Sequence, residues 1–223
     1  DTVLGVLSLS AHAEAALGLL ADIAFEPRFA PDDFDRLRTM RRRRLSQMRD
    51  VPSAVADRVF VESLFQGHPY GHLPIGTEAS LEALALDEVR EFHARAFVAS
   101  QATLVMVGDV GHDEAPRLAE RGFARVGAPG RENGFSKAPV VSGPALGRHA
   151  MVVHRPGAQQ SELRIGRIGA SRATSDYHAL VVANAVLGGQ FSSRINLNLR
   201  ERKGYTYGAR SYFDFRRAPG PFV

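Results

Sequence analysis

The most restrictive feature of this chain is the stretch that runs from Leu187 to Tyr207. A Gly-Gly pair follows Leu187 and ends a helix there, and Ser192 or Ser193 then opens a short second helix as its N-cap. Gly204 stands where the second helix must end with a positive φ, which glycine adopts without steric penalty. Because the β-rich sequence Tyr-Thr-Tyr comes next, the stretch predicts a helix, a turn, a short helix and a strand in that order.

The composition allows a substantial core and excludes several classes of protein. The chain has 223 residues, of which 44% are apolar, and this is enough for one large domain or two modest ones. No apolar run is long enough to span a bilayer, so we expect no membrane span. The absence of cysteine excludes disulfides and thiolate zinc sites. Both ends look cut, and we therefore expect a piece of a longer protein.

The positive charge of the chain does not predict nucleic-acid binding. The net charge is +4, and the densest basic cluster is Arg41–Arg44. This cluster lies within a predicted helix whose apolar positions are Phe34, Leu37, Met40, Leu45 and Met48. Most of these arginines then face water, and no aromatic residues interleave with them to stack on bases. We therefore expect no nucleic-acid partner.

Periodicity and turn residues predict helices and strands on both sides of a linker. The Gly/Pro/Ser-rich stretch 127–147 is the predicted linker. Ser10 and Ser53 are predicted helix caps, and Asp32 and Asp33 are expected in the first turn of the second helix. The predicted helices are 11–25, 32–50, 53–67, 80–84, 87–97, 113–121 and 175–187. The predicted strands are 102–108, 150–154, 162–168 and 205–215, of which the first is expected to be buried.

Short motifs in a fixed order resemble those of the M16 metallopeptidases, the insulinase, pitrilysin and processing-peptidase type. That family carries Gly-Gly…Ser-Arg-Leu…Leu-Arg-Glu-x-Lys-Gly-x-x-Tyr, which the stretch from Leu187 to Tyr207 matches closely. Earlier parts of the chain carry weaker matches in the family's order. These are Glu26-Pro-Arg-Phe, Asp33-Phe-Asp-Arg, Asp50-x-Pro-Ser, His68-Pro-Tyr-Gly, Gly76-Thr-Glu and Leu104-x-x-Val-Gly-Asp.

The resemblance implies an α+β fold of the M16 type (LuxS/MPP-like), in which an antiparallel sheet packs with helices. Residues 1–126 would be the C-terminal half of a first domain, and residues 148–223 the N-terminal half of a second. Since the two domains of this family are similar, the two halves could pack as a circularly permuted domain, within one chain or by swapping between two chains.

The resemblance also implies a zinc site that this chain lacks. The family holds zinc with an inverted His-x-x-Glu-His helix and a glutamate on a later helix, and no His-x-x-Glu-His occurs in these residues. Aligning Phe34 and Pro52 with the family pattern places the two glutamates of the later helix on Leu37 and Arg44. Arginine cannot deprotonate to bind a metal, so we predict that this chain binds no metal.

The resemblance gives Arg200 and Tyr207 a role in binding peptides. Local sequence alone favours a surface arginine and a half-buried strand tyrosine. In the family, the arginine and tyrosine at these positions grip the substrate backbone. We therefore predict a non-catalytic, substrate-binding subunit of a heterodimeric bacterial zinc peptidase, with zinc held by an M16 homologue. The alternatives are a structural subunit without a role in proteolysis, and a peptidase whose metal site lies upstream with an unusual third ligand.

Other candidate sites are weaker. The two histidines of His68-Pro-Tyr-Gly-His72 are predicted to lie in a structural turn, and the remaining histidines occur singly. Ser192 and Ser193 lack the surroundings of a serine nucleophile, so helix capping is expected instead. The resemblance favours the periplasm over the cytoplasm as the compartment.

Overall fold

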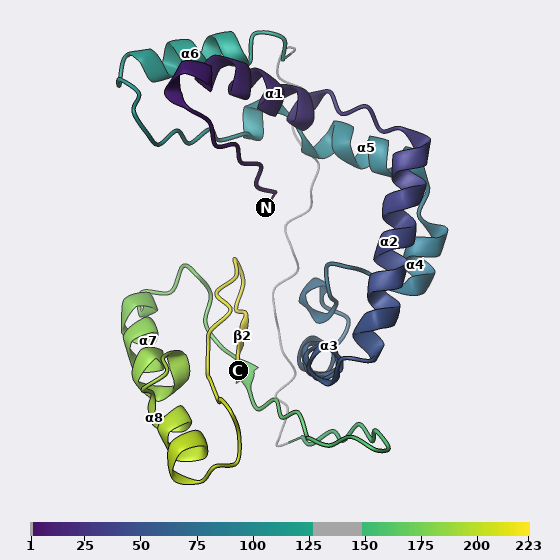
Figure 1. Cartoon of the computed structure of the whole chain (residues 1–223), viewed down its shortest axis with the longest axis vertical. Coiled ribbons are helices and arrows are strands. Elements are labelled where there is room, and N and C mark those ends of the chain that lie inside the picture. Colours follow the sequence, from purple (N-terminus) through teal and green to yellow (C-terminus); the bar gives the residue numbers. More distant parts are fainter. Residues whose placement is uncertain (1, 127–148) are drawn as a thin grey trace. The chain divides into compact units, whose positions relative to one another are not determined.

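The computed structural model describes residues 2–126 and 149–223, and these form two compact units. The first unit comprises the described residues of Asp1–Met40 and Ala79–Ser136, and the second comprises Arg41–Glu78 with the described residues of Lys137–Val223. Figure 1 shows that both units draw on early and late parts of the chain. The predicted linker, 127–147, lies outside the described residues, and the sequence-based division at that linker stays a prediction.

The first unit is built on a pair of helices from opposite ends of its sequence. Helix α1 (Ala13–Phe25) lies along α6 (Glu114–Gly122), as Figure 1 shows. Leu17 of α1 and Leu118 of α6 are buried, and Gly122 sits so close to Leu17 that a Cβ on the glycine would clash. Arg121 and Glu14 form an ion pair at 2.8 Å beside this contact. Small and branched apolar residues thus set the approach of the two helices.

The remaining helices of this unit are short and packed by aromatic rings. A 3₁₀ turn, Ser10–His12, precedes α1, and another, Ala99–Gln101, follows α5 (Leu86–Ala96). Helix α4 (Glu78–Ala83) comes before α5. His93 of α5 lies 2.8 Å from the carbonyl oxygen of Ala24 through Nε2, and its ring stacks on Phe97 at 4.6 Å. His93 therefore connects α5 to the end of α1.

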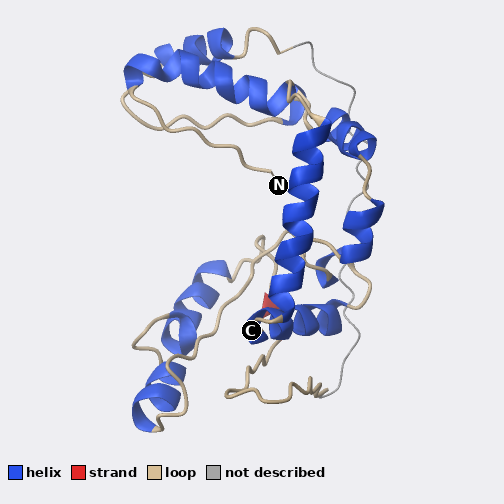
Figure 2. Cartoon of the chain, turned by 45° about the vertical axis from the view of Figure 1, so that its right-hand side comes forward, coloured by secondary structure: helices blue, strands red, loops and turns tan. Residues whose placement is uncertain are grey.

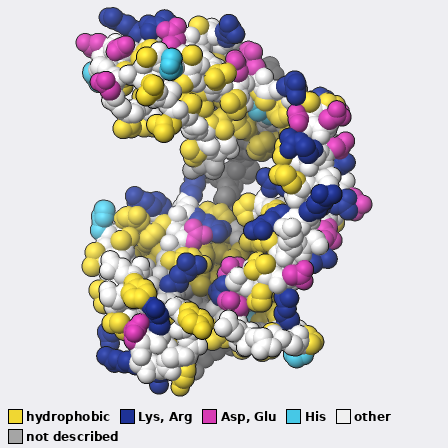
Figure 3. Space-filling view, in the orientation of Figure 1, with side chains coloured by type: hydrophobic (Ala, Val, Ile, Leu, Met, Phe, Trp, Pro, Cys, Tyr) yellow, Lys and Arg dark blue, Asp and Glu magenta, His cyan; other side chains and the backbone are white. Residues whose placement is uncertain are grey.

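Helix α2 (Pro31–Arg49) is the longest of the described helices, and it follows the predicted pattern. Asp33 in its first turn accepts hydrogen bonds from Arg36 and Arg28, and these lower the pKa of its carboxyl group. Leu45 is buried, while Arg41–Arg44 are exposed as expected. The acidic residues of α2 lie near its start, and Figure 3 shows dark-blue basic side chains exposed on the part of the surface where this helix runs. The arginine run is thus a solvated helix face.

The second unit joins a helix from before the predicted linker to chain segments from after it. Helix α3 (Pro52–Phe65) is followed by a 3₁₀ turn, Pro69–Gly71. After residue 149 come α7 (Tyr177–Asn184), a π-type turn (Ala185–Gly189), α8 (Arg194–Asn196) and a second π-type turn (Leu197–Arg202). Strands β1 (Arg167–Ile168) and β2 (Pro221–Phe222) pair antiparallel, with Arg167 opposite Phe222. The described fold is therefore α+β, mostly helical with a small antiparallel sheet.

Two polar connections hold α3 and the 3₁₀ turn after it to the later segments. Arg164 donates to Asp57 on α3 at 2.5 Å and to Glu162 at 2.9 Å, and these carboxylates raise the pKa of the guanidinium against the opposing effect of burial. The hydroxyl of Tyr70 accepts from the backbone N–H of Ala218 at 3.2 Å, and Arg216 lies over the same ring at 4.7 Å. Residues from both sides of the predicted linker thus belong to one unit.

Replacing Arg164 with alanine is expected to destabilise the second unit by about 1–2 kcal/mol, because the hydrogen-bonded ion pair with Asp57 is lost. The loss is no larger because Asp57 is half exposed and water can solvate its carboxylate. Chemical denaturation of the purified protein measures this. Arg167→Ala is the matched control, since Arg167 is exposed and its side chain bonds only the neighbouring Ile168 carbonyl. Equal midpoints for the two variants would contradict the structural role of Arg164.

The predicted strands are largely wrong, whereas the predicted helices are confirmed to within a few residues. Residues 102–108 do not form a buried strand, because Val105 and Val107 are exposed and no described strand pairs with them. Residues 150–154 and 205–211 also form loops, and of 162–168 only Arg167–Ile168 pair (Figure 2). Apolar β-branched runs favour extended backbone, but a strand also needs a neighbour to accept its hydrogen bonds.

The helix starts at Ser10 and Ser53 also differ from the prediction. Ser10 lies within a 3₁₀ turn, and α1 itself begins after His12. Helix α3 begins one residue earlier than expected, since Pro52 occupies its first turn and Val51 stands at the N-cap. Proline is well suited to the first helical position because its missing N–H has no partner there. None of the described helices is both long and apolar enough to cross a membrane.

Candidate functional site

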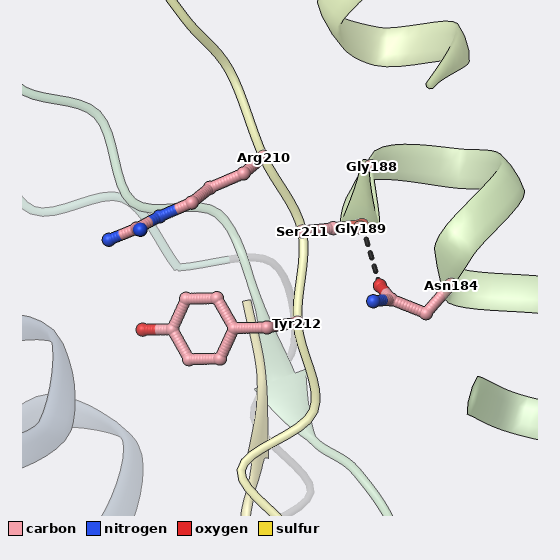
Figure 4. Close-up of a pocket in the computed structure, with 6 residues that line it drawn as sticks. All are labelled: Asn184, Gly188, Gly189, Arg210, Ser211 and Tyr212. Carbon is pink, nitrogen blue, oxygen red and sulfur yellow. Dashed lines mark hydrogen bonds between the residues drawn. The ribbon is translucent and has the colours of Figure 1, made fainter. Parts of the chain in front are cut away.

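The segment that carries Arg200 and Tyr207 begins where α7 ends against a later loop. Gly188 contacts Ser211 so closely that a Cβ would lie 2.5 Å from the Ser211 backbone nitrogen, which excludes larger residues. The Ser211 N–H donates to the Gly188 carbonyl at 2.9 Å, and its hydroxyl donates to Asn184 at 2.7 Å (Figure 4). The predicted Gly-Gly helix end is therefore confirmed, and its purpose is close approach of two backbones.

Asn196 connects the two halves of the candidate site. The residue is only 4% exposed, and its side-chain amide donates to the Phe191 carbonyl at 2.6 Å. Its side-chain oxygen accepts from the backbone N–H of Ala209 at 3.0 Å. The loop before α8 and the loop after Tyr207 are thus held by one buried amide, which uses both its donor and its acceptor.

Arg200 lies in the π-type turn after α8 with part of its hydrogen-bonding capacity unused. Its side chain is 33% exposed, and its guanidinium carbon lies 4.3 Å from the ring centroid of Phe191. Nη1 is shielded from solvent and makes no hydrogen bond, because the nearest carboxylate oxygen, on Glu201, is 3.6 Å away. That contact is an ion pair without a hydrogen bond, so the guanidinium retains a donor without an acceptor.

Tyr207 projects from the segment into solvent. It is 92% exposed, so it is not the half-buried strand residue that its local sequence favours. Gly204 has φ +63°, as predicted, and turns the chain after the π-type turn. Thr206 accepts from the Gly208 N–H at 3.2 Å and donates to the Gly208 carbonyl at 2.9 Å, which fixes the backbone around Tyr207. Arg200 and Tyr207 belong to the same unit, and no hydrogen bond joins them among the described residues.

Ser193 occupies the predicted N-cap position of α8, but its hydroxyl makes no capping bond. The residue is buried, and its oxygen has no hydrogen-bond partner. In residues 2–126 and 149–223, this oxygen and Arg200 Nη1 are the two buried side-chain polar atoms that have no hydrogen-bond partner. Both atoms therefore fall in the short segment between Phe191 and Arg202, where such atoms point to function or strain.

A cavity of about 360 Å³ lies beside this segment but does not include the predicted site residues. Figure 4 shows Arg210 and Tyr212 extending from one side of their loop, away from Asn184. The polar groups that line the cavity therefore do not converge on a common point, and they do not form a recognisable ligand-binding or catalytic arrangement. The residues that line it are Asn184, Gly188, Gly189, Arg210, Ser211 and Tyr212.

The two positions aligned with zinc-ligand glutamates lie on α2 and do not fit a metal. Leu37 and Arg44 are both exposed, and their spacing puts them on the same face two turns apart. An isobutyl group has no donor atom, and a guanidinium is a cation without a free lone pair. Within residues 2–126 and 149–223, no group of three His, Asp or Glu residues is placed to hold a metal ion.

The turn predicted at His68 and His72 is observed. His68 accepts from the backbone N–H of Tyr70 through Nδ1 at 3.0 Å, and its ring lies 4.8 Å from that of Tyr70. A 3₁₀ turn separates it from His72.

Sequence reasoning missed Phe191 and Asn196, which the structure places at the centre of the site. Phe191 has the sequence context of an ordinary apolar residue after a turn, and only the folded chain brings its ring under Arg200. Asn196 carried a usable signal, since asparagine in a short helix is unfavourable unless its side chain bonds backbone groups.

Comparisons with known proteins agree with this reading of the fold. The family model described as "Peptidase M16 inactive domain" matches residues 83–223. Curated relatives include an uncharacterized zinc protease of Mycobacterium leprae, 29% identical over 92% of this chain and 46% of its own length, and one of Bacillus subtilis, 26% identical over 92% and 48%. The chain thus spans about half the length of these relatives.

Solved structures give the same picture. A peptidase M16 inactive domain from Pseudomonas fluorescens superposes with a TM-score of 0.79 at 25% identity, covering 97% of this chain and 51% of that one. A protease from Helicobacter pylori superposes with a TM-score of 0.80 at 21% identity, covering 96% and 52%, and shows the fold alone. Because the family model matches more than half of the residues, this chain belongs to the peptidase M16 inactive-domain family.

Proposed function

We propose that this chain is the non-catalytic, peptide-binding part of an M16-type zinc peptidase. The observation that carries the proposal is the pair of donors on one segment, the exposed phenol of Tyr207 and the partly exposed guanidinium of Arg200, whose shielded Nη1 makes no hydrogen bond. A peptide carbonyl accepts hydrogen bonds from both kinds of group. The segment that presents them is fixed by Gly188, Ser211 and Asn196, so the donors stand on a rigid support.

The chemistry that such a site supplies is positioning. Hydrogen bonds to the backbone of an extended peptide are independent of its sequence and fix its register. Holding the scissile bond in a reactive geometry can account for a large share of a rate enhancement without any proton transfer by the residues that bind. Arg200 and Tyr207 would therefore act on the substrate while another set of residues performs the hydrolysis.

We assign the zinc to a homologous partner subunit rather than to this chain. Relatives are named zinc proteases, whereas Leu37 and Arg44 cannot serve as ligands at the positions that match the family's glutamates. In such a heterodimer the partner would supply the metal and its ligands, and this chain would supply the peptide grip. The periplasm remains the compartment that we favour.

Affinity purification of the full-length protein from its own cells tests the partnership. Recovery of a homologue with His-x-x-Glu-His supports the divided site and provides the subunit for reconstitution. Stoichiometric zinc in the full-length protein purified alone would instead support the reading with an upstream metal site.

A structural subunit is the second candidate, and the exposed apolar residues Val105, Val107 and Val152 favour it as surfaces for assembly. Peptide affinity separates the two readings. A structural subunit with a relic Arg/Tyr pair should bind an unstructured peptide no more tightly than its Arg200→Ala variant does.

Replacing Tyr207 with phenylalanine is expected to weaken peptide binding roughly 2- to 10-fold, since one neutral hydrogen bond is lost while the ring remains. The measurement is the dissociation constant of a labelled, unstructured peptide. Tyr205→Phe is the matched control, because Tyr205 is also exposed and lies two residues away. An equal effect of both substitutions would remove the specific role of Tyr207.

A further inference from the structure

We propose that Phe191 is a positioning residue, which holds the Arg200 guanidinium flat so that it meets neutral peptide carbonyls edge-on. This inference rests on the proposed function and adds a residue to it. Its starting point is the stacking of Arg200 on the Phe191 ring, at 4.3 Å from the guanidinium carbon to the ring centroid. That distance is well within the range of a cation–π contact.

Phe191 is suited to this task because its backbone is held in place while its ring lies at the surface, where Arg200 can pack on it. Phe191 is 69% exposed, so burial in the core does not explain its position. Its carbonyl accepts from the buried Asn196 side chain at 2.6 Å, and the N–H of Ser193 donates to the Gln190 carbonyl at 3.1 Å. The loop that carries the ring is therefore anchored on both sides.

Stacking on Phe191 restricts the directions from which a ligand can approach the guanidinium. All five N–H donors of arginine lie in the plane of the group. With one face covered by Phe191, ligands must approach along the edges of the guanidinium that remain open, since the side chain is 33% exposed although Nη1 itself is shielded. A free arginine side chain would have to give up rotational freedom on binding, and a stacked one has already lost much of it.

Glu201 sets the charge preference of the site. Its carboxylate lies 3.6 Å from Arg200 Nη1, which offsets the positive charge without making a hydrogen bond. An incoming carboxylate would meet this negative group, whereas a neutral carbonyl would not. The chemical class that the pair accepts is thus the backbone of a peptide, in preference to its acidic side chains or its terminal carboxylate.

The test measures the order of the arginine and the affinity for peptide separately. The variants Phe191→Leu and Phe191→Tyr are made in the full-length protein, with Arg200→Ala as the reference. The probe is a fluorescently labelled, unstructured peptide with blocked ends and no acidic residues. Side-chain NMR of the arginine guanidinium groups reports the rotation of Arg200 without peptide. Tyr205→Leu is the matched control, because the Tyr205 ring is also exposed and lies 5.6 Å from the Lys203 ammonium nitrogen.

We expect Phe191→Leu to weaken peptide binding roughly 3- to 10-fold and to speed the rotation of the Arg200 guanidinium, whereas Phe191→Tyr retains both properties. Unchanged Arg200 signals in Phe191→Leu would overturn the inference whether or not peptide binds. Changed signals with unchanged affinity would overturn it as well. An Arg200→Ala variant with wild-type affinity would instead refute the proposed function, and the positioning role with it.

Discussion

Replacing Arg200 with alanine is expected to lower the peptidase activity of the reconstituted pair roughly 10- to 100-fold. A hydrogen bond from a charged donor contributes about 1.5–3 kcal/mol, and its loss translates into a factor of that size. The loss should appear mainly in kcat/KM, because the arginine binds substrate and does not transfer protons. The substitution is expected to change the stability of the protein little, since Nη1 makes no hydrogen bond in the described structure.

The measurement is steady-state cleavage of an unstructured peptide by the partner subunit mixed with each variant. Arg202→Ala is the matched control, because Arg202 lies in the same π-type turn and is exposed. Arg200→Lys adds a second comparison, since lysine keeps the charge but cannot stack as a plane or donate along two edges. Wild-type activity of Arg200→Ala at equal partner concentration would show that the residue is a relic.

The helices of this chain were accessible to sequence reasoning because their signals are local. Asp32 and Asp33 in the first turn and Pro52 after the end bracket α2, and the observed helix, Pro31–Arg49, matches that bracket. Strands depend on neighbours that the local sequence does not name. Val105 and Val152 have the side chains of strand residues, yet they lie exposed in loops of the described structure.

The candidate site could be predicted only in part from the sequence, for a related reason. The motif from Leu187 to Tyr207 predicted Arg200 and Tyr207, because the family resemblance attaches roles to those positions. It could not predict that Phe191 lies under Arg200 or that Asn196 bonds two loops. The first contact depends on how the loop before α8 folds against the turn after it, and the bond to Ala209 depends on how the chain returns after Gly204. Residues that position other residues through tertiary contacts are therefore hard to identify from the sequence alone.

Asn196→Ala is expected to lower the free energy of unfolding of the second unit by about 1–3 kcal/mol, because it removes two part-buried hydrogen bonds to backbone groups. The Phe191 carbonyl loses its donor, and the Ala209 N–H loses its acceptor. Chemical denaturation measures the loss. Asn198→Ala is the matched control, since Asn198 lies two residues away and takes part through its backbone carbonyl, which the substitution keeps. Similar denaturation midpoints for the two variants would contradict this account.

The same substitution separates stability from binding in a way that the arginine variant cannot. The Asn196 side chain bonds to the backbone of Phe191 and Ala209 and not to Arg200 or Tyr207, and so it holds the loop of Phe191 and the loop after Tyr207. If the grip depends on that spacing, Asn196→Ala should weaken peptide binding even under conditions where the protein remains folded. Asn196→Asp refines the test, because a carboxylate can still accept from Ala209 but can no longer donate to Phe191. A folded Asn196→Asp protein with wild-type affinity would show that the anchor on Phe191 is dispensable, and a weakened one would show that peptide binding depends on it.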